Sequence, residues 1–96
     1  MKRPYELALV VRVDSNEEVM NDAVDQVKDW IEVDDSGTVT KIDRWGRKRL
    51  AYEIDRQREG YYVIMEAMIE TEALPELERN LKLSSSYLRY LIVRPE

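Results

Sequence analysis

The chain has 96 residues, of which 44% are hydrophobic and 36% are charged, and its formal net charge is −5. This length supports one hydrophobic core, so we expect a single domain spanning residues 1–96. Cysteine and histidine do not occur in the sequence, which excludes disulfides, thiolate catalysis, zinc-finger ligation and the commonest general base. No apolar stretch approaches the roughly 20 residues of a membrane-spanning helix, and the N-terminus does not lead into a signal peptide. We therefore expect a cytoplasmic protein.

Charge is distributed unevenly along the chain. Residues 14–35 hold nine acidic residues and one basic residue, a net charge of −8. Residues 41–58 hold seven basic residues and three acidic ones, a net charge of +4. Because phosphate binding depends on clustered Lys and Arg, the second segment is a candidate for binding nucleic acid although the whole chain is acidic.

The first predicted elements are a strand and a helix. Residues 5–13 alternate with apolar side chains on both faces, which indicates a central strand. Ser15 and Glu18 have the spacing of a capping box, which predicts that a helix begins there and continues to about Glu32. One face of this helix is acidic, and the predicted apolar face consists of Val19, Met20, Ala23, Val24, Val27, Trp30 and Ile31.

A long second strand is predicted after a turn at residues 35–37. Gly46 interrupts the pattern, and an isolated glycine in a strand usually marks a bulge or bend, so we expect one strand over residues 38–54. Residues 56–60 form the predicted hairpin loop. Residues 61–69 alternate and are the predicted third strand.

A second helix and a fourth strand complete the pattern. Thr71 is the predicted N-cap of the helix, Pro75 lies in or near its first turn, and its buried stripe consists of Leu74, Leu77 and Leu81. Residues 87–93 alternate as the last strand. The resulting order β-α-β-β-α-β predicts a ferredoxin-like α+β sandwich, a four-stranded antiparallel sheet with two helices on one face and the opposite face left for a partner.

The strongest local signal is the basic run of Arg47, Lys48 and Arg49, which directly follows Gly46. Two interpretations stay open at this point. A basic strand edge resists edge-to-edge aggregation. Alternatively, the run supplies charges and guanidinium groups to phosphate oxygens or to an acidic partner.

The segment from Gly46 to Ile54, GRKRLAYEI, resembles the signature of the sixth protein of the bacterial small ribosomal subunit. Residues 5–6, 60–62, 77–81 and 88–94 lie where that family has similar segments, so the resemblance covers nearly the whole chain. It implies a structural component of the small ribosomal subunit that binds small-subunit ribosomal RNA together with the eighteenth small-subunit protein. It also implies a place in the cytoplasm within the ribosome, no catalysis, no cofactor, no metal and no small-molecule substrate.

The resemblance further implies seven RNA-binding positions, which are Lys2, Arg3, Tyr5, Arg56, Lys82, Arg89 and Arg94. The run Arg47, Lys48 and Arg49 would meet either the RNA or the partner protein. The remaining cations are most simply solvated surface residues, namely Arg12, Lys28, Arg58 and Arg79. Arg89 differs from these because it shares a predicted strand side with Tyr87, Leu91 and Val93, and an arginine among apolar groups usually has a partner.

Three other functions remain as alternatives. The RNA-recognition motif has the same element order, but its aromatic positions on the two central strands are missing here, where Leu7 to Val10 occupy the first strand. A regulatory ligand-binding domain that dimerises through its open sheet would need convergent polar groups or a glycine-rich phosphate loop. An enzyme would need a catalytic pair, and the acidic pairs at residues 17–18 and 34–35 have no second catalytic group beside them.

Overall fold

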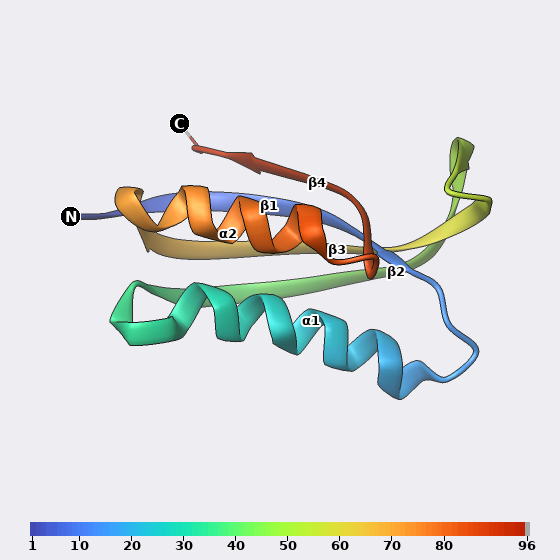
Figure 1. The fold of residues 1–96 in the computed structure, drawn as a ribbon, viewed down its shortest axis with the longest axis horizontal. Coiled ribbons are helices and arrows are strands. Elements are labelled where there is room, and N and C mark those ends of the chain that lie inside the picture. Colours follow the sequence, from blue (N-terminus) through green and yellow to red (C-terminus); the bar gives the residue numbers. More distant parts are fainter. Residues whose placement is uncertain (96) are drawn as a thin grey trace.

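The chain folds into four strands and two α-helices (Figure 1), and the computed structural model describes residues 1–95. The strands are β1 (Lys2–Arg12), β2 (Gly37–Ile54), β3 (Gln57–Glu70) and β4 (Tyr87–Val93). The α-helices are α1 (Glu17–Glu32) and α2 (Leu74–Leu83), and the short 3₁₀ helices are η1 (Val33–Asp35) and η2 (Thr71–Ala73). Neighbouring strands pair antiparallel in the order β2-β3-β1-β4. The predicted ferredoxin-like α+β fold is confirmed, with β1 in the centre of the sheet.

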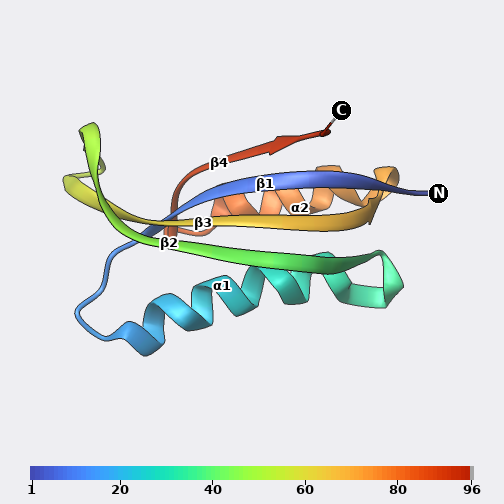
Figure 2. The ribbon, with the colours of Figure 1, turned by 180° about the vertical axis from the view of Figure 1, so that it is seen from behind.

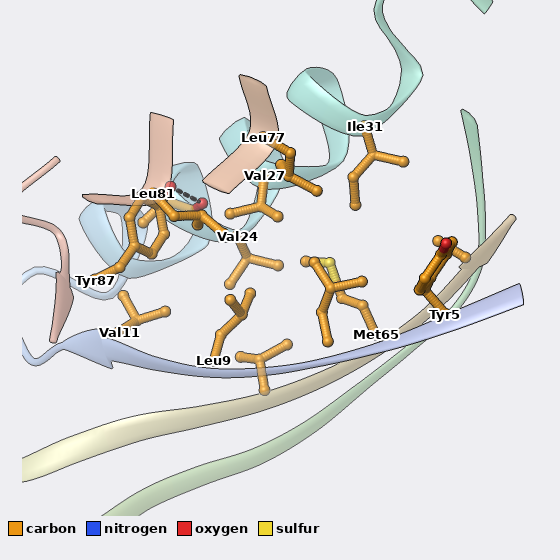
Figure 3. Packing of buried hydrophobic residues seen from close by; sticks show 14 of the residues in the cluster. Tyr5, Leu9, Val11, Val24, Val27, Ile31, Met65, Leu77, Leu81 and Tyr87 are labelled. Atoms are coloured by element: carbon orange, nitrogen blue, oxygen red, sulfur yellow. Dashed lines mark hydrogen bonds between the residues drawn. The ribbon is translucent and has the colours of Figure 1, made fainter. Parts of the chain in front are cut away.

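Both helices cover the same face of the sheet and enclose one hydrophobic core (Figure 3). The odd-numbered residues of β1 and β3 point into this core, because successive side chains of a strand alternate between faces. The most deeply buried side chains are Leu7, Leu9, Val11, Val24, Val27, Ile31, Val63, Met65, Ile69 and Leu81. Each contributes about 1.5–3 kcal/mol relative to full exposure, which makes this layer the main source of stability. The even-numbered residues point to the opposite face, which is called the open face below.

Helix α1 begins one residue later than the capping-box pattern predicts. Asn16 is the N-cap, and its side-chain oxygen accepts a hydrogen bond of 3.0 Å from the backbone N–H of Glu18. The predicted Ser15 cap is therefore wrong; Asn caps a helix as well as Ser does. Val19 is 47% exposed, so it also falls outside the packed face on which the sequence placed it.

Helix α2 begins with a 3₁₀ turn instead of the predicted Thr71 side-chain cap. Thr71 opens η2, and its backbone carbonyl accepts a hydrogen bond from the N–H of Leu74. Pro75 lies in the first turn of α2, as predicted, where its missing N–H removes no helical hydrogen bond. Leu77 and Leu81 are buried, and Leu74 packs partly against the core.

Strand β4 contains a bulge that the alternation of its sequence does not reveal. Val11 pairs with Tyr87 and Val10 pairs with Arg89, so Leu88 is an extra residue in the ladder. A bulge of one residue reverses the face of everything beyond it. Tyr87 therefore faces the helices, whereas Arg89 faces the open side, and the prediction that the two share a side is wrong.

The β2–β3 hairpin extends beyond the rest of the sheet and bends away from α1, as two opposite views show (Figures 1 and 2). The predicted irregularity at Gly46 is confirmed, because the register shifts between Arg44 and Gly46, and Gly46 has a φ of +87°. The hairpin turn is tighter than the predicted loop over residues 56–60. It consists of Asp55 and Arg56, which have φ values of 49° and 64°.

A second irregularity lies close to the tip of the same hairpin. Arg49 pairs with Glu59, and the next pair is Ile54 with Gln57. The four residues of β2 from 50 to 53 thus lie opposite a single residue of β3, Arg58. This segment, called the 50–53 excursion below, is not paired in the ladder. Its side chains can therefore reach positions that those of a regularly paired strand cannot.

Candidate functional site

The base of the excursion packs onto the open face of the sheet. Leu50 is only 9% exposed although it belongs to an edge strand. A Cβ atom placed on Gly60 would lie 2.2 Å from Cγ1 of Val10 and 3.3 Å from Cδ2 of Leu50. The hairpin and β1 approach each other this closely only because residue 60 has no side chain.

Arg12 holds three segments together at this end of the molecule. Its guanidinium group pairs with the carboxylate of Asp55 in the hairpin turn, and its Nε donates a hydrogen bond of 2.9 Å to the carbonyl of Ser85. Its backbone N–H donates to the carbonyl of Ser86 at 2.7 Å. The expectation that Arg12 is merely solvated is therefore wrong: it fixes the hairpin turn and the α2–β4 connection to the end of β1.

Arg89 and Tyr52 form the contact that joins the excursion to β4. The guanidinium carbon of Arg89 lies 5.4 Å from the centre of the Tyr52 ring, a cation–π arrangement. These residues belong to the two opposite edge strands, β4 and β2. The excursion is what allows Tyr52 to reach across the open face, and its ring is still 57% exposed.

Lys82 and Arg89, two of the predicted RNA-binding residues, lie in one place. Both line a hollow of about 350 Å³ at the edge formed by β4, together with Leu81, Tyr87, Leu88 and Tyr90. Over residues 1–95, four ion pairs form, and none of them includes Lys82 or Arg89. These two exposed charges are therefore available to an external anion.

The other predicted positions are spread over both ends of the sheet. Lys2 and Arg3 open β1, where Lys2 pairs with Glu70 at the end of β3. Arg94 follows β4, whose last residue, Val93, pairs with Glu6. Arg94 therefore lies at the same end of the sheet as Lys2 and Arg3. Arg56 lies at the hairpin turn, at the other end. Among these cations, Arg3, Arg56 and Arg94 are exposed, and Lys2 is half-buried.

Tyr5 does not belong to this surface. Its side chain is 5% exposed and lies in the core beneath the helices (Figure 3). The odd-numbered positions of β1 face the helices, so the alternation of the strand places Tyr5 there. The assignment of Tyr5 to RNA contact is corrected on this ground, since a buried ring has no face to offer a ligand.

The basic run lies on the outer edge of the hairpin. Arg47 forms an ion pair of 3.7 Å with Glu59 of β3, and both side chains are more than half exposed. Lys48 and Arg49 are exposed on the same edge strand. Charged residues at this position also protect the free edge of β2 from pairing with another chain.

Helix α1 gives the helix-covered side of the molecule the opposite charge. Its exposed residues include five acids, which are Glu17, Glu18, Asp22, Asp25 and Asp29. Within the described part of the chain, no group of three or more acidic residues is arranged to hold a metal ion. Nor is any helix in residues 1–95 long and apolar enough to cross a membrane.

The fold and its charges define a class: a small ferredoxin-like protein with free cations along one sheet edge and an acidic helix on the covered face. The particular family follows from comparison with known proteins. The sequence profile of the family described as ribosomal protein S6 matches residues 4–94. The chain belongs to the ribosomal protein S6 family and is a protein of the small ribosomal subunit.

Individual relatives agree with this assignment. Small ribosomal subunit protein bS6 of Moorella thermoacetica is 44% identical over 94 residues, which cover 98% of this chain and 95% of the relative. Its counterpart in Carboxydothermus hydrogenoformans is 38% identical over 96 residues, covering 100% and 99%. The crystal structure of 30S ribosomal protein S6 from Thermotoga maritima has a TM-score of 0.90 at 28% identity, covering 99% of this chain and 89% of that one. The RNA-recognition motif and the regulatory domain are thereby set aside as families.

Proposed function

We propose that residues 1–96 act as one non-catalytic domain that binds small-subunit ribosomal RNA together with the eighteenth small-subunit protein. The observation that carries the proposal is the pair Lys82 and Arg89, two exposed cations that line one hollow at the β4 edge. Family membership supports association with ribosomal RNA. The two exposed cations support the β4 edge as the proposed place of contact.

The RNA side of the proposed interface runs along the β4 edge and continues to both ends of the sheet. Lys82 and Arg89 form its centre, and the remaining proposed contacts are Lys2, Arg3, Arg56 and Arg94. Arginine forks and lysine ammonium groups bind phosphate oxygens, and such contacts fix the position of structured RNA without reading its sequence. A few cations spread over a long edge suit the recognition of RNA by its shape.

The partner protein is proposed to cover the part of the open face nearer the start of β1, beyond the contact of Arg89 with Tyr52. Leu91 and Val93 lie there, 60% and 39% exposed, beside half-buried side chains of β1 and β3, which include Ala8, Ile64 and Met68. Contiguous exposed apolar surface of this kind marks protein–protein contact. Lys48 and Arg49, and Arg47 with its Glu59 partner, lie beside this face and would meet the partner or the RNA at the boundary.

The acidic helix directs this arrangement. Negative charge on the helix-covered side repels phosphate, so RNA docking is restricted to the cationic edge. The separation of acidic and basic residues explains how a chain with a net charge of −5 would bind RNA. Binding depends on the positive charge at the contact surface, and the net charge of the whole chain does not determine it.

The test is a titration of the full chain against a central-domain fragment of small-subunit ribosomal RNA, with and without the eighteenth protein, at several salt concentrations. We expect tight binding only with the partner, because each protein supplies part of the basic surface. Affinity should fall steeply as salt increases, since binding releases counterions from the RNA. Lys82→Gln and Arg89→Gln should each reduce the salt slope, the slope of log affinity against log salt concentration, by about one.

Lys28→Gln is the matched control, because Lys28 is an exposed lysine on acidic helix α1. It removes the same charge and should leave both the affinity and the salt slope unchanged. Binding that is insensitive to salt, or that is equal with and without the partner protein, would contradict the proposal.

A further inference from the structure

We propose that the 50–53 excursion forms a binding site for one unpaired nucleotide of RNA, with its base stacked on the Tyr52 ring and its phosphate on Arg49 and Arg58. This inference rests on the proposed RNA-binding function and adds a site to it. Tyr52 and Arg58 are absent from the contacts that the family resemblance implied, and Arg49 was assigned there only to the RNA or the partner protein as part of the basic run.

The excursion creates a hollow on the hairpin. The hollow has a volume of about 250 Å³ and is lined by Arg49, Leu50, Ala51, Tyr52, Glu53 and Arg58. Regular pairing would close this space; here the four residues from 50 to 53 lie opposite Arg58 alone. Bulges commonly re-aim side chains next to functional sites, and this one brings an aromatic ring and two guanidinium groups together.

The Tyr52 ring is held in place but not covered. The Arg89 guanidinium lies over the ring at 5.4 Å from its centre, and 57% of the residue remains exposed. A ring that is already oriented loses less conformational entropy when a base stacks on it. Single-stranded RNA is bound in this way, by stacking of bases on aromatic rings and guanidinium planes.

The charges in the hollow suit a phosphate. Arg49 and Arg58 outnumber Glu53, which lies 3.6 Å from Arg58, and both members of that pair are more than half exposed. An exposed ion pair of this kind contributes little to stability, so Arg58 can exchange Glu53 for a phosphate group. A protein segment would be the weaker fit, because a protein interface centre is depleted in charge.

The experiment compares Tyr52→Leu with Tyr52→Phe in the heterodimer bound to the same ribosomal RNA fragment. Stacking on an aromatic ring implies that Tyr52→Leu weakens binding by roughly 5- to 100-fold with an unchanged salt slope, whereas Tyr52→Phe binds like the wild type. Arg58→Gln should instead lower the salt slope by about one. Chemical probing of the RNA should show one unpaired nucleotide that is protected by the wild type and reactive with Tyr52→Leu.

Trp45→Leu is the matched control. Trp45 is 54% exposed on the same strand and does not line the hollow, so its loss should leave RNA affinity unchanged. Equal RNA affinity and equal protection with Tyr52→Leu would overturn this inference alone. So would a Tyr52→Leu defect in binding the partner protein without RNA that accounts for the whole loss of RNA affinity. No binding of the RNA by the wild-type heterodimer would overturn the proposed function itself.

Discussion

The hydroxyl of Tyr87 donates a hydrogen bond of 2.6 Å to the backbone carbonyl of Ala23 (Figure 3). This bond ties the first residue of β4 to the middle of α1, across a sequence separation of 64 residues. The Tyr87 ring also meets the Trp30 ring edge to face, with 5.7 Å between ring centres. The bulge at Leu88 makes the contact possible by turning Tyr87 toward the helices.

Changing Tyr87 to Phe removes this hydrogen bond and keeps the ring. The free energy of unfolding should fall by about 1 kcal/mol, the usual net worth of one hydrogen bond. Urea denaturation should show a lower midpoint with an unchanged slope. Tyr61→Phe is the matched control, because Tyr61 is only partly buried against the same core. A midpoint equal to that of the wild type would show that the bond adds nothing.

Stability should also depend on pH through Tyr87, because burial raises the pKa of its phenol from 10.0 to about 12. Below pH 10 the phenol is neutral in both the folded and the unfolded chain, so its contribution is fully present. Between pH 10 and 12 the unfolded chain loses the proton first, and the contribution is progressively lost as pH rises. The advantage of the wild type over Tyr87→Phe should therefore shrink by up to about 1.4 kcal/mol per pH unit in this window. Denaturation series at pH 8 to 11 would measure it, and a constant difference would contradict the assignment.

Gly60→Ala should disturb the packing of the hairpin on β1. A methyl group there would lie 2.2 Å from Cγ1 of Val10, and overpacking of this kind costs about 1–3 kcal/mol. Adding Val10→Ala removes the clashing atom, so the double variant should lose less stability than the two single losses predict. Gly46→Ala is the control: it meets nothing within 4 Å, its cost arises from the φ of +87°, and Val10→Ala should not relieve it. Additive losses for Gly60 and Val10 would contradict the contact.

The pair of Arg12 and Asp55 should hold the hairpin turn in place. The Asp55 side chain is 66% exposed and that of Arg12 is 30% exposed, so solvent screening limits the coupling to at most about 1 kcal/mol. A double-mutant cycle with Arg12→Gln and Asp55→Asn measures this coupling. Amide hydrogen exchange of residues 50–58 should accelerate in either variant, because the turn loses its attachment to β1. Unchanged exchange in both would mean that the packing of Leu50 alone holds the hairpin.

Most of the fold follows from periodicity alone. Alternation predicts the strands and the central position of β1, and the 3.6-residue pattern predicts α1 through its packed residues Val24, Val27 and Ile31. The burial of apolar side chains strongly determines the register of each strand, because a shift of one residue would expose all the apolar side chains of its buried face. The N-cap is less well determined, because Ser15 and Asn16 are both good caps and only the local geometry chooses between them.

The candidate site is less predictable because it depends on irregular pairing. The bulge at Leu88 and the 50–53 excursion decide that Arg89 and Tyr52 meet, and neither leaves a glycine or proline mark in the sequence. The sequence did indicate that Arg89 has a partner, and the Tyr52 ring confirms this. Arg12 was missed because its partners, Asp55 and Ser85, are 43 and 73 residues away along the chain. The alternation that places Tyr5 on the core face was available in the sequence and outweighs the resemblance at that position.

The pairing of β1 with β4 has a consequence for how the protein is made. Glu6 lies opposite Val93 and Val11 lies opposite Tyr87. Strand β1 can therefore form this pairing only after β4, the last of the four strands, has been synthesised. Until β4 emerges, one edge of β1 is unpaired and the core lacks Tyr87. Contacts between distant parts of a chain form slowly and leave strand edges exposed in the meantime. The sheet of this protein is therefore completed only once its last strand has left the ribosome that translates it.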